Sequence, residues 1–104
     1  MDTITTLEDF ESNLIKHDIM LVIAKTHSCA TCQIINAHLL RTIPMLDKIP
    51  HYQLFVDDVE AFRGKYVVFS VPTVLIFAKE KEILRESRFI DTHKINRLLE
   101  NYLQ

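Results

Sequence analysis

The sequence predicts an α/β fold in which helices cover both faces of a central mixed sheet of four to five strands, a three-layer α/β/α sandwich. Three patterns support this architecture. The run at residues 19–24 is continuously apolar and rich in β-branched residues, which is typical of a central strand buried on both faces. Helical patterns between the early strands imply parallel crossovers. A short polar stretch between two late strands indicates an antiparallel hairpin.

The first helix is expected to begin near residue 5. Thr5 and Glu8 have the spacing of a capping box, in which each side chain bonds a free backbone N–H of the first turn. Apolar residues then recur at helical spacing, and the helix is expected to end at about Lys16. The central strand at 19–24 follows.

A second helix is expected to begin at or near Cys29 and to run to about Arg41, because this segment contains neither glycine nor proline. Pro44 ends or kinks this helix. A second strand is expected at 52–56 and a short helix at 59–65. Because each of these helices separates two strands, the strands that they connect are expected to be parallel.

The C-terminal part of the chain predicts a hairpin and a last helix. The strand at 73–77 begins directly after Pro72, and polar residues separate it from a strand at 82–89. Asp91 is a suitable N-cap for a helix whose apolar residues follow at helical spacing.

Length and composition indicate one globular domain over residues 1–104, long enough to bury a single core. The 12 basic and 14 acidic side chains nearly balance, so no nucleic-acid partner is expected. The apolar runs are too short to span a bilayer and the N-terminus lacks a signal-peptide pattern, so we expect a cytoplasmic protein with no membrane partner. The single glycine, Gly64, excludes glycine-rich phosphate-binding loops.

The two cysteines, Cys29 and Cys32, form a Cys-x-x-Cys motif where the central strand is followed by a helix. A helix N-terminus presents unpaired backbone amides and a partial positive charge, which favour the thiolate of Cys29. Cys29 is therefore predicted to attack a substrate disulfide as the nucleophile. Cys32 is predicted to resolve the mixed disulfide by closing the Cys29–Cys32 bridge. No cofactor beyond this redox-active disulfide is expected.

Other readings of the cysteine pair stay open. Free cysteines are often small buried core residues. The pair can also belong to a binding adaptor or redox sensor, in which two chains share four thiolates around zinc or an iron–sulfur cluster. The scattered histidines offer no second ligand pair at zinc-finger spacing, so no metal site is expected within one chain.

The cysteine motif and a later segment together resemble the thioredoxin family. Val71, Pro72 and Thr73 stand directly before the predicted hairpin, as the family's proline segment does. Over essentially the whole chain, the resemblance implies the thioredoxin fold. It also implies that Pro72 is cis and packs against the cysteine pair, and that the main chain at Val71 pairs with the substrate like an added strand.

The same resemblance implies a thiol-disulfide oxidoreductase that reduces protein disulfides. Its partners are then a disulfide-containing protein and an upstream thiol reductant such as a thioredoxin reductase. We expect the protein to act as a monomer. Ser28 and Ala30, on either side of Cys29, are expected to contact the substrate together with Thr73.

The sequence departs from the family pattern near the cysteines. A buried aspartate of the family corresponds to Ile23, and a tryptophan corresponds to Lys25. Lys25 and His27 are therefore candidates to modulate the thiols. A cationic Lys25 can lower a thiol pKa, and His27 can stabilise the Cys29 thiolate or carry a proton. For both residues the alternative is an ordinary solvated side chain.

Missing glycines form a second departure. The family ordinarily has glycine between the cysteines, just before the proline and near the end of the second hairpin strand. This chain has Ala30, Ser70 and Arg88 in those places. The side chains of Ser70 and Arg88 are therefore expected beside the substrate groove and to change its shape.

Overall fold

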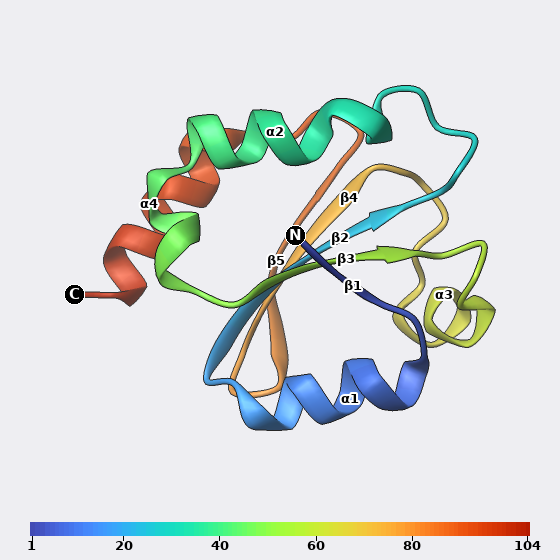
Figure 1. The fold of residues 1–104 in the computed structure, drawn as a ribbon. Coiled ribbons are helices and arrows are strands. Elements are labelled where there is room, and N and C mark those ends of the chain that lie inside the picture. The colour runs from blue at the N-terminus through green and yellow to red at the C-terminus, as the bar shows by residue number, and fades with distance from the viewer.

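The computed structural model describes residues 1–104 as one five-stranded mixed sheet with helices on both faces (Figure 1). The elements in chain order are β1 (Asp2–Ile4), α1 (Leu7–Lys16), β2 (Ile19–Lys25), α2 (Cys32–Thr42), the 3₁₀ helix η1 (Pro44–Lys48), β3 (His51–Phe55), α3 (Glu60–Tyr66), β4 (Thr73–Ala78), β5 (Lys81–Ser87) and α4 (Thr92–Tyr102). Helices α2 and α4 cover one face of the sheet, and α1 and α3 cover the other. The predicted three-layer sandwich is confirmed. None of the helices is long and apolar enough to cross a bilayer.

The strand order in the sheet is β1-β3-β2-β4-β5, which places β2 at the centre. Strand β3 runs parallel to both β1 and β2, whereas β4 is antiparallel to β2 and to β5. Helix α2 and η1 form the crossover from β2 to β3, and a tight turn joins β4 to β5. The predicted parallel crossover through α2 and the predicted antiparallel hairpin are therefore confirmed. The expectation that the short helix α3 also joins parallel strands is wrong, because β4 runs antiparallel to β2 and therefore opposite to β3.

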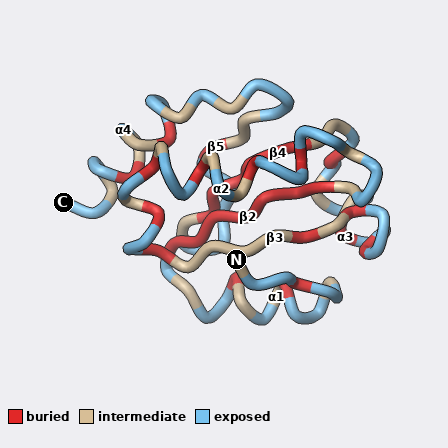
Figure 2. Tube along the Cα trace, turned by 45° about the horizontal axis from the view of Figure 1, so that its top comes forward, coloured by how far each residue is buried: buried red, intermediate tan, exposed pale blue.

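Strand β2 is buried along its whole length, as its continuous apolar run predicts (Figure 2). Successive side chains point to opposite faces of the sheet and enter two separate apolar layers. Met20, Val22 and Ala24 pack with residues of α1 and α3, whereas Leu21 and Ile23 pack with residues of α2 and α4. One strand thus supplies both halves of the core.

Strand β1 is an element that the sequence does not reveal. It is 3 residues long and only Ile4 among them is buried, so no alternating pattern is visible. It forms by pairing in parallel with β3, Asp2 opposite Tyr52 and Ile4 opposite Leu54. With β1 the sheet has five strands, within the expected range of four to five.

Helix α1 is capped by Thr6, so the predicted capping box of Thr5 and Glu8 is wrong. The Thr6 hydroxyl oxygen accepts a hydrogen bond from the Asp9 backbone N–H at 3.0 Å. Because an acidic residue follows three positions after each threonine, the two possible caps look alike in the sequence.

The other boundaries lie close to the predicted ones. Strand β3 begins and ends one residue earlier than expected, and α3 begins and ends one residue later. Strand β5 ends at Ser87 rather than at 89, because Arg88 has a left-handed φ of 65°, which interrupts an extended strand. Asp91 caps α4 as predicted, accepting a hydrogen bond from the Lys94 N–H at 3.0 Å.

Replacing Phe10 with alanine is expected to lower the free energy of unfolding by about 3 to 5 kcal/mol, the usual cost of removing a large buried ring. Phe10 is fully buried, and its ring packs edge-on against Phe62, Tyr66 and Phe77 at centroid distances of 4.9, 5.0 and 5.4 Å. Urea denaturation measures the change. Phe89→Ala is the matched control, because Phe89 is 92% exposed. Equal losses in the two variants would contradict this account of the core.

Candidate active site

The two cysteines lie at the end of the sheet where β2 passes into α2. Residues 26–31 form turns, and α2 begins at Cys32, so the expectation of a helix start at or near Cys29 is wrong. The Cys29 N–H donates instead to the Thr26 carbonyl at 3.4 Å. The two cysteines form a disulfide with their Cα atoms 5.2 Å apart, which confirms that the motif has disulfide geometry.

The two sulfurs have different surroundings. Cys32 is completely buried, whereas Cys29 is partly exposed, with exposed Ser28 and Ala30 on either side. The Cys32 N–H, at the first turn of α2, donates to the Cys29 sulfur at 3.2 Å, and the Thr31 hydroxyl oxygen lies 3.2 Å from the same sulfur. Such donors favour a negative charge on Cys29. The helix N-terminus therefore acts on Cys29 even though Cys29 precedes the helix.

The segment 71–73 lies at the same end of the sheet as the cysteines. Ala24, near the end of β2, pairs with Thr73 at the start of β4, so the loop before β4 and the turn after β2 leave the sheet side by side. The Val71–Pro72 peptide bond is cis, as the resemblance implies. Pro72 and Thr73 are buried, and Val71 is half-buried.

Exposed side chains adjoin this proline loop. The Arg88 N–H donates to the Pro72 carbonyl at 2.8 Å, which places exposed Arg88 beside the proline. Phe89, the next residue, is 92% exposed, and Phe69 is 69% exposed. The sequence does not distinguish these two phenylalanines from core residues. The only sequence signal for their location is that Phe69 is close to Pro72 and Phe89 is close to the end of the hairpin.

Lys25 ends β2 as a buried lysine, so its interpretation as a solvated charge is wrong. It is only 5% exposed, and its Nζ donates to Gln53 Oε1 at 2.9 Å and to Asn36 Oδ1 at 3.3 Å. The Nζ atom also lies 5.3 Å from the centre of the Phe55 ring. None of the ion pairs in the structure includes Lys25. Burial therefore lowers the pKa of Lys25.

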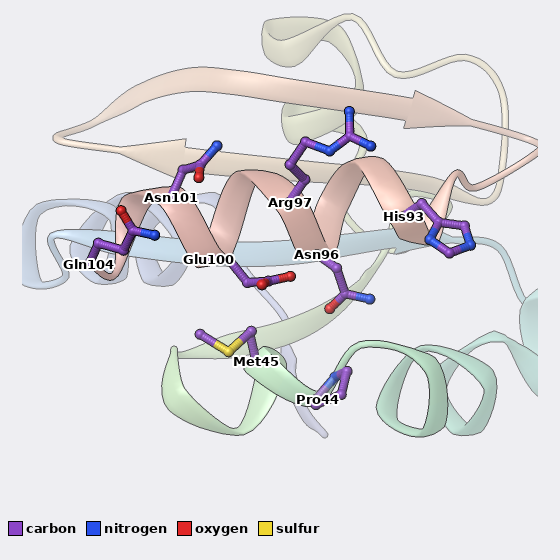
Figure 3. Close-up of a pocket in the computed structure, with 8 residues that line it drawn as sticks. All are labelled: Pro44, Met45, His93, Asn96, Arg97, Glu100, Asn101 and Gln104. Atoms are coloured by element: carbon purple, nitrogen blue, oxygen red, sulfur yellow. The ribbon is translucent and has the colours of Figure 1, made fainter.

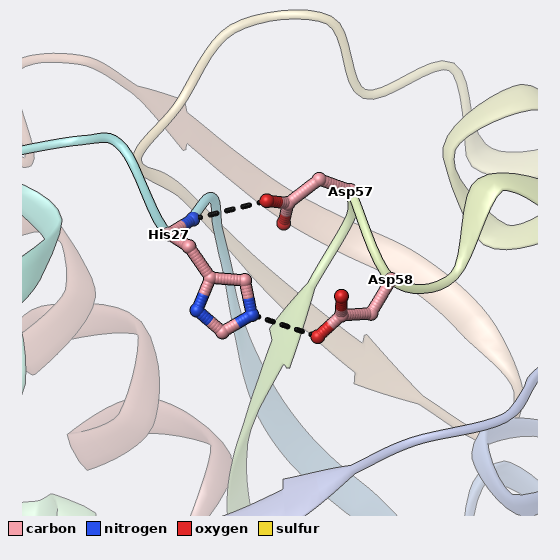
Figure 4. A group of neighbouring side chains, drawn as sticks. All are labelled: His27, Asp57 and Asp58. Carbon is pink, nitrogen blue, oxygen red and sulfur yellow. Dashed lines mark hydrogen bonds and ion pairs between the residues drawn. The ribbon is translucent and has the colours of Figure 1, made fainter.

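His27 is an exposed side chain held by two aspartates (Figure 4). Its Nε2 lies 2.7 Å from Asp58 Oδ2, its backbone N–H donates to Asp57 Oδ2 at 3.2 Å, and its ring stacks on Phe55 with centroids 4.0 Å apart. The hydrogen bond with Asp58 raises the pKa of His27. The imidazole makes no hydrogen bond to Cys29, so the structure brings His27 to Asp58 rather than to the nucleophile.

A cavity of about 270 Å³ has Cys32 and Lys25 in its lining, beside Thr26, His27, Gln33 and Phe55. A larger pocket of about 640 Å³ lies between α4 and η1, is lined mostly by polar side chains and contains neither cysteine (Figure 3). The smaller cavity is therefore the one that belongs to the cysteine pair.

Comparison with known proteins agrees with this geometry. The family model described as Thioredoxin matches residues 2–101. Two Bacillus subtilis relatives are the thioredoxin-like protein YdfQ, 25% identical over 95% of this chain and 88% of its own length, and the thioredoxin-like protein YusE, 31% identical over 90% and 86%. A solved Plasmodium falciparum thioredoxin superposes with a TM-score of 0.83 at 18% identity, covering 98% of this chain and 99% of that one. This last similarity shows a shared fold.

Asp58→Asn is expected to lower the pKa of His27 toward its ordinary value of about 6.5, because Asp58 provides the hydrogen bond that stabilises the imidazolium. Asp57→Asn, which removes a charge but leaves the hydrogen bond between the imidazole and Asp58, should lower it less. Titration of the His27 ring protons by NMR measures both values. An unchanged His27 pKa in Asp58→Asn would contradict the ion pair.

The sign of the effect on stability follows from the raised pKa. A raised pKa means that the fold favours charged His27, so the contribution of the pair is fully present below about pH 6.5 and is lost as the pH rises through the raised value. The free energy of unfolding, measured by denaturation, should accordingly be lower in Asp58→Asn than in the wild type, and this difference should be larger below about pH 6.5 than at high pH.

Proposed function

Since this chain belongs to the thioredoxin family and holds Cys29 and Cys32 at disulfide distance, we propose that it reduces the disulfides of other proteins through this pair. The fold and the cysteine pair support thiol-disulfide oxidoreduction as the class of reaction. The observation that carries the proposal is the unequal exposure of the sulfurs, because only Cys29 is open to a large substrate.

The reaction proceeds in two exchanges. The Cys29 thiolate attacks one sulfur of the client disulfide, a mixed disulfide forms, and the other client sulfur leaves as a thiolate that takes up a proton. Cys32 then attacks the Cys29 sulfur, which closes the Cys29–Cys32 bridge and releases the second client thiolate. Two electrons pass from the dithiol to the client. The donors that surround the Cys29 sulfur support its role as nucleophile.

The client is held at the proline loop. Val71 lies outside β4, and its backbone N–H and C=O bond no other backbone group in the turns and loops of the fold, so they are free to pair with an extended client segment. Ser28 and Ala30 supply contacts around Cys29, and exposed Phe69 and Phe89 offer apolar surface to the same client. Thr73, expected as a further contact, is buried and bonds Ser70 and Ser87, so it supports the loop instead.

A second partner must reduce the pair again after each turnover. The Cys29–Cys32 disulfide takes two electrons from an upstream thiol reductant, such as a thioredoxin reductase. This requirement favours the cytoplasm, where thiols are kept reduced.

Cys29→Ser is expected to abolish reduction of a disulfide protein such as insulin with dithiothreitol as the electron source, because the attacking sulfur is absent. Cys32→Ser should instead accumulate a mixed disulfide between Cys29 and the client, detectable by mass spectrometry. Precipitation of the reduced insulin chain measures turnover. Ile15→Ser places the same new residue on an exposed position of α1 and should keep full activity.

The opposite results are equally clear. Wild-type turnover no faster than dithiothreitol alone would reject the proposed function. Zinc or iron that copurifies with the protein and is lost on Cys29→Ser would favour the metal-sharing adaptor instead.

Arg88→Gly is expected to raise the free energy of unfolding by about 1 kcal/mol, because a side chain at a left-handed φ of 65° is strained. It should also speed reduction of bulky clients relative to a small disulfide, since the backbone of Arg88 is hydrogen-bonded to Pro72 and the residue is exposed there. The matched control is Glu80→Gly in the hairpin turn, where φ is 68°. This control should gain stability without a change in client preference. An equal change of client preference in Arg88→Gly and Glu80→Gly would contradict a role of Arg88 at the groove.

A further inference from the structure

Lys25 is a buried lysine that pairs with no carboxylate. The other positions of β2 are all apolar, and Lys25 is 5% exposed with only the neutral amides of Asn36 and Gln53 as hydrogen-bond partners. A buried ammonium without a carboxylate is costly. Structural packing alone would favour an apolar residue here, so the position indicates a chemical use.

The cavity beside Lys25 is also lined by Cys32, the cysteine that must resolve the mixed disulfide. Lys25 and Cys32 line the same cavity of about 270 Å³, which has room for water. Lys25 Nζ makes no direct hydrogen bond to Cys32, so a proton has to pass between them through such a water. Cys32 itself is completely buried, and the apolar side chain of Ile23, also fully buried, offers no proton acceptor.

The other groups that face this cavity are less suited to accept a proton. From β3, Gln53 and Phe55 reach Lys25, and both are neutral. From the turn after β2, His27 lines the cavity, but its side chain is exposed and pairs with Asp58 at the surface rather than lying buried with Lys25 and Cys32. From α2, Cys32 is the only titratable group in the lining. The lowered pKa of Lys25 gives it a larger neutral fraction than an exposed lysine has.

We propose that Lys25 accepts the proton of the Cys32 thiol, through one water in this cavity, when Cys32 resolves the mixed disulfide. The proton moves from Cys32 Sγ to the neutral Nζ of Lys25. The Cys32 thiolate then attacks Cys29 Sγ, a sulfur–sulfur bond forms between the cysteines, and the bond from Cys29 to the client breaks. The client leaves as a thiolate and takes a proton from solvent, while the Lys25 ammonium returns its proton to solvent. This role deepens the proposed reductase function and rests on it.

The test separates the two exchanges with a chromogenic probe. Reduced protein reacts with dithiobis-nitrobenzoate and releases one coloured thionitrobenzoate when Cys29 forms the mixed disulfide, at a rate proportional to probe concentration. It releases a second when Cys32 closes the bridge, at a rate independent of probe concentration. Stopped-flow absorbance resolves the two phases in the wild type, in Lys25→Gln, which keeps an amide in the polar cluster, and in Lys25→Met. Lys81→Gln, at an exposed lysine of β5, is the matched control.

At pH 7 the second phase is expected to slow about tenfold or more in both Lys25 variants, in line with the loss of a positioned base, while the first phase changes by no more than about twofold. In the wild type the second-phase rate should level off above the pKa of Lys25. In Lys25→Gln it should keep rising with pH until the Cys32 thiol itself ionises. Lys81→Gln should match the wild type in both phases.

Three results would overturn the role of Lys25: an unchanged second phase, an unchanged pH profile, or an equal loss in both phases, which would indicate a structural effect. A wild-type protein that releases only the first thionitrobenzoate would reject the proposed function itself, because Cys32 would then not resolve. The intact first phase in Lys25→Gln serves as the check that the variant is folded.

Discussion

Burial of β2 on both faces is the constraint from which the rest of the structure follows. Its side chains fill two apolar layers at once, so the helices on both faces pack against the same strand. The strand must also end somewhere, and its exit fixes the turn that carries Cys29. Because antiparallel β4 starts where β2 ends, the same constraint brings Pro72 to that turn. The redox site is thus a consequence of how the core is built.

The site combines two kinds of electrostatic environment within a few residues. Cys29 lies in front of a helix N-terminus and receives a backbone N–H, which favours its anion. Lys25 is held among neutral amides and an aromatic ring, which disfavours its cation. His27 lines the same cavity, but its side chain is exposed and pairs with Asp58 at the surface. The end of the sheet that carries the cysteines therefore combines a helix N-terminus that favours an anion with a buried lysine whose cation is disfavoured.

Much of this could be predicted from local sequence patterns. The apolar run of β2, the Asp91 cap and the cysteine spacing are local signals, and the family resemblance located cis-Pro72. What escaped prediction depends on distant partners. The burial of Lys25 is decided by Asn36 and Gln53, which stand 11 and 28 residues away in the chain.

Weak local signals explain the remaining differences. Strand β1 has too few buried residues to show a pattern, and it exists only because β3 offers a free edge. The sequence predicts the start of α2 at Cys29, three residues before the observed start at Cys32. The N-cap, Thr31, makes no side-chain cap hydrogen bond, so this boundary lacks the usual N-cap interaction. Thr5 and Thr6 are both followed three residues later by an acidic residue, so the sequence does not show which of them caps α1.

The two edges of the sheet have a consequence for unwanted association. One edge, β1, is only 3 residues long, and the other, β5, is irregular in register and carries charged Lys81, Glu82 and Arg85. Short, charged or bulged edges discourage a foreign strand from adding to the sheet. Val71, whose backbone makes no hydrogen bond to other backbone groups, lies in the loop before β4, at the end of the sheet that carries the cysteines. In the reductase function proposed above, the protected edges would leave this loop as the place where an extended client pairs, so capture of a client and its reduction would occur at the same end of the sheet.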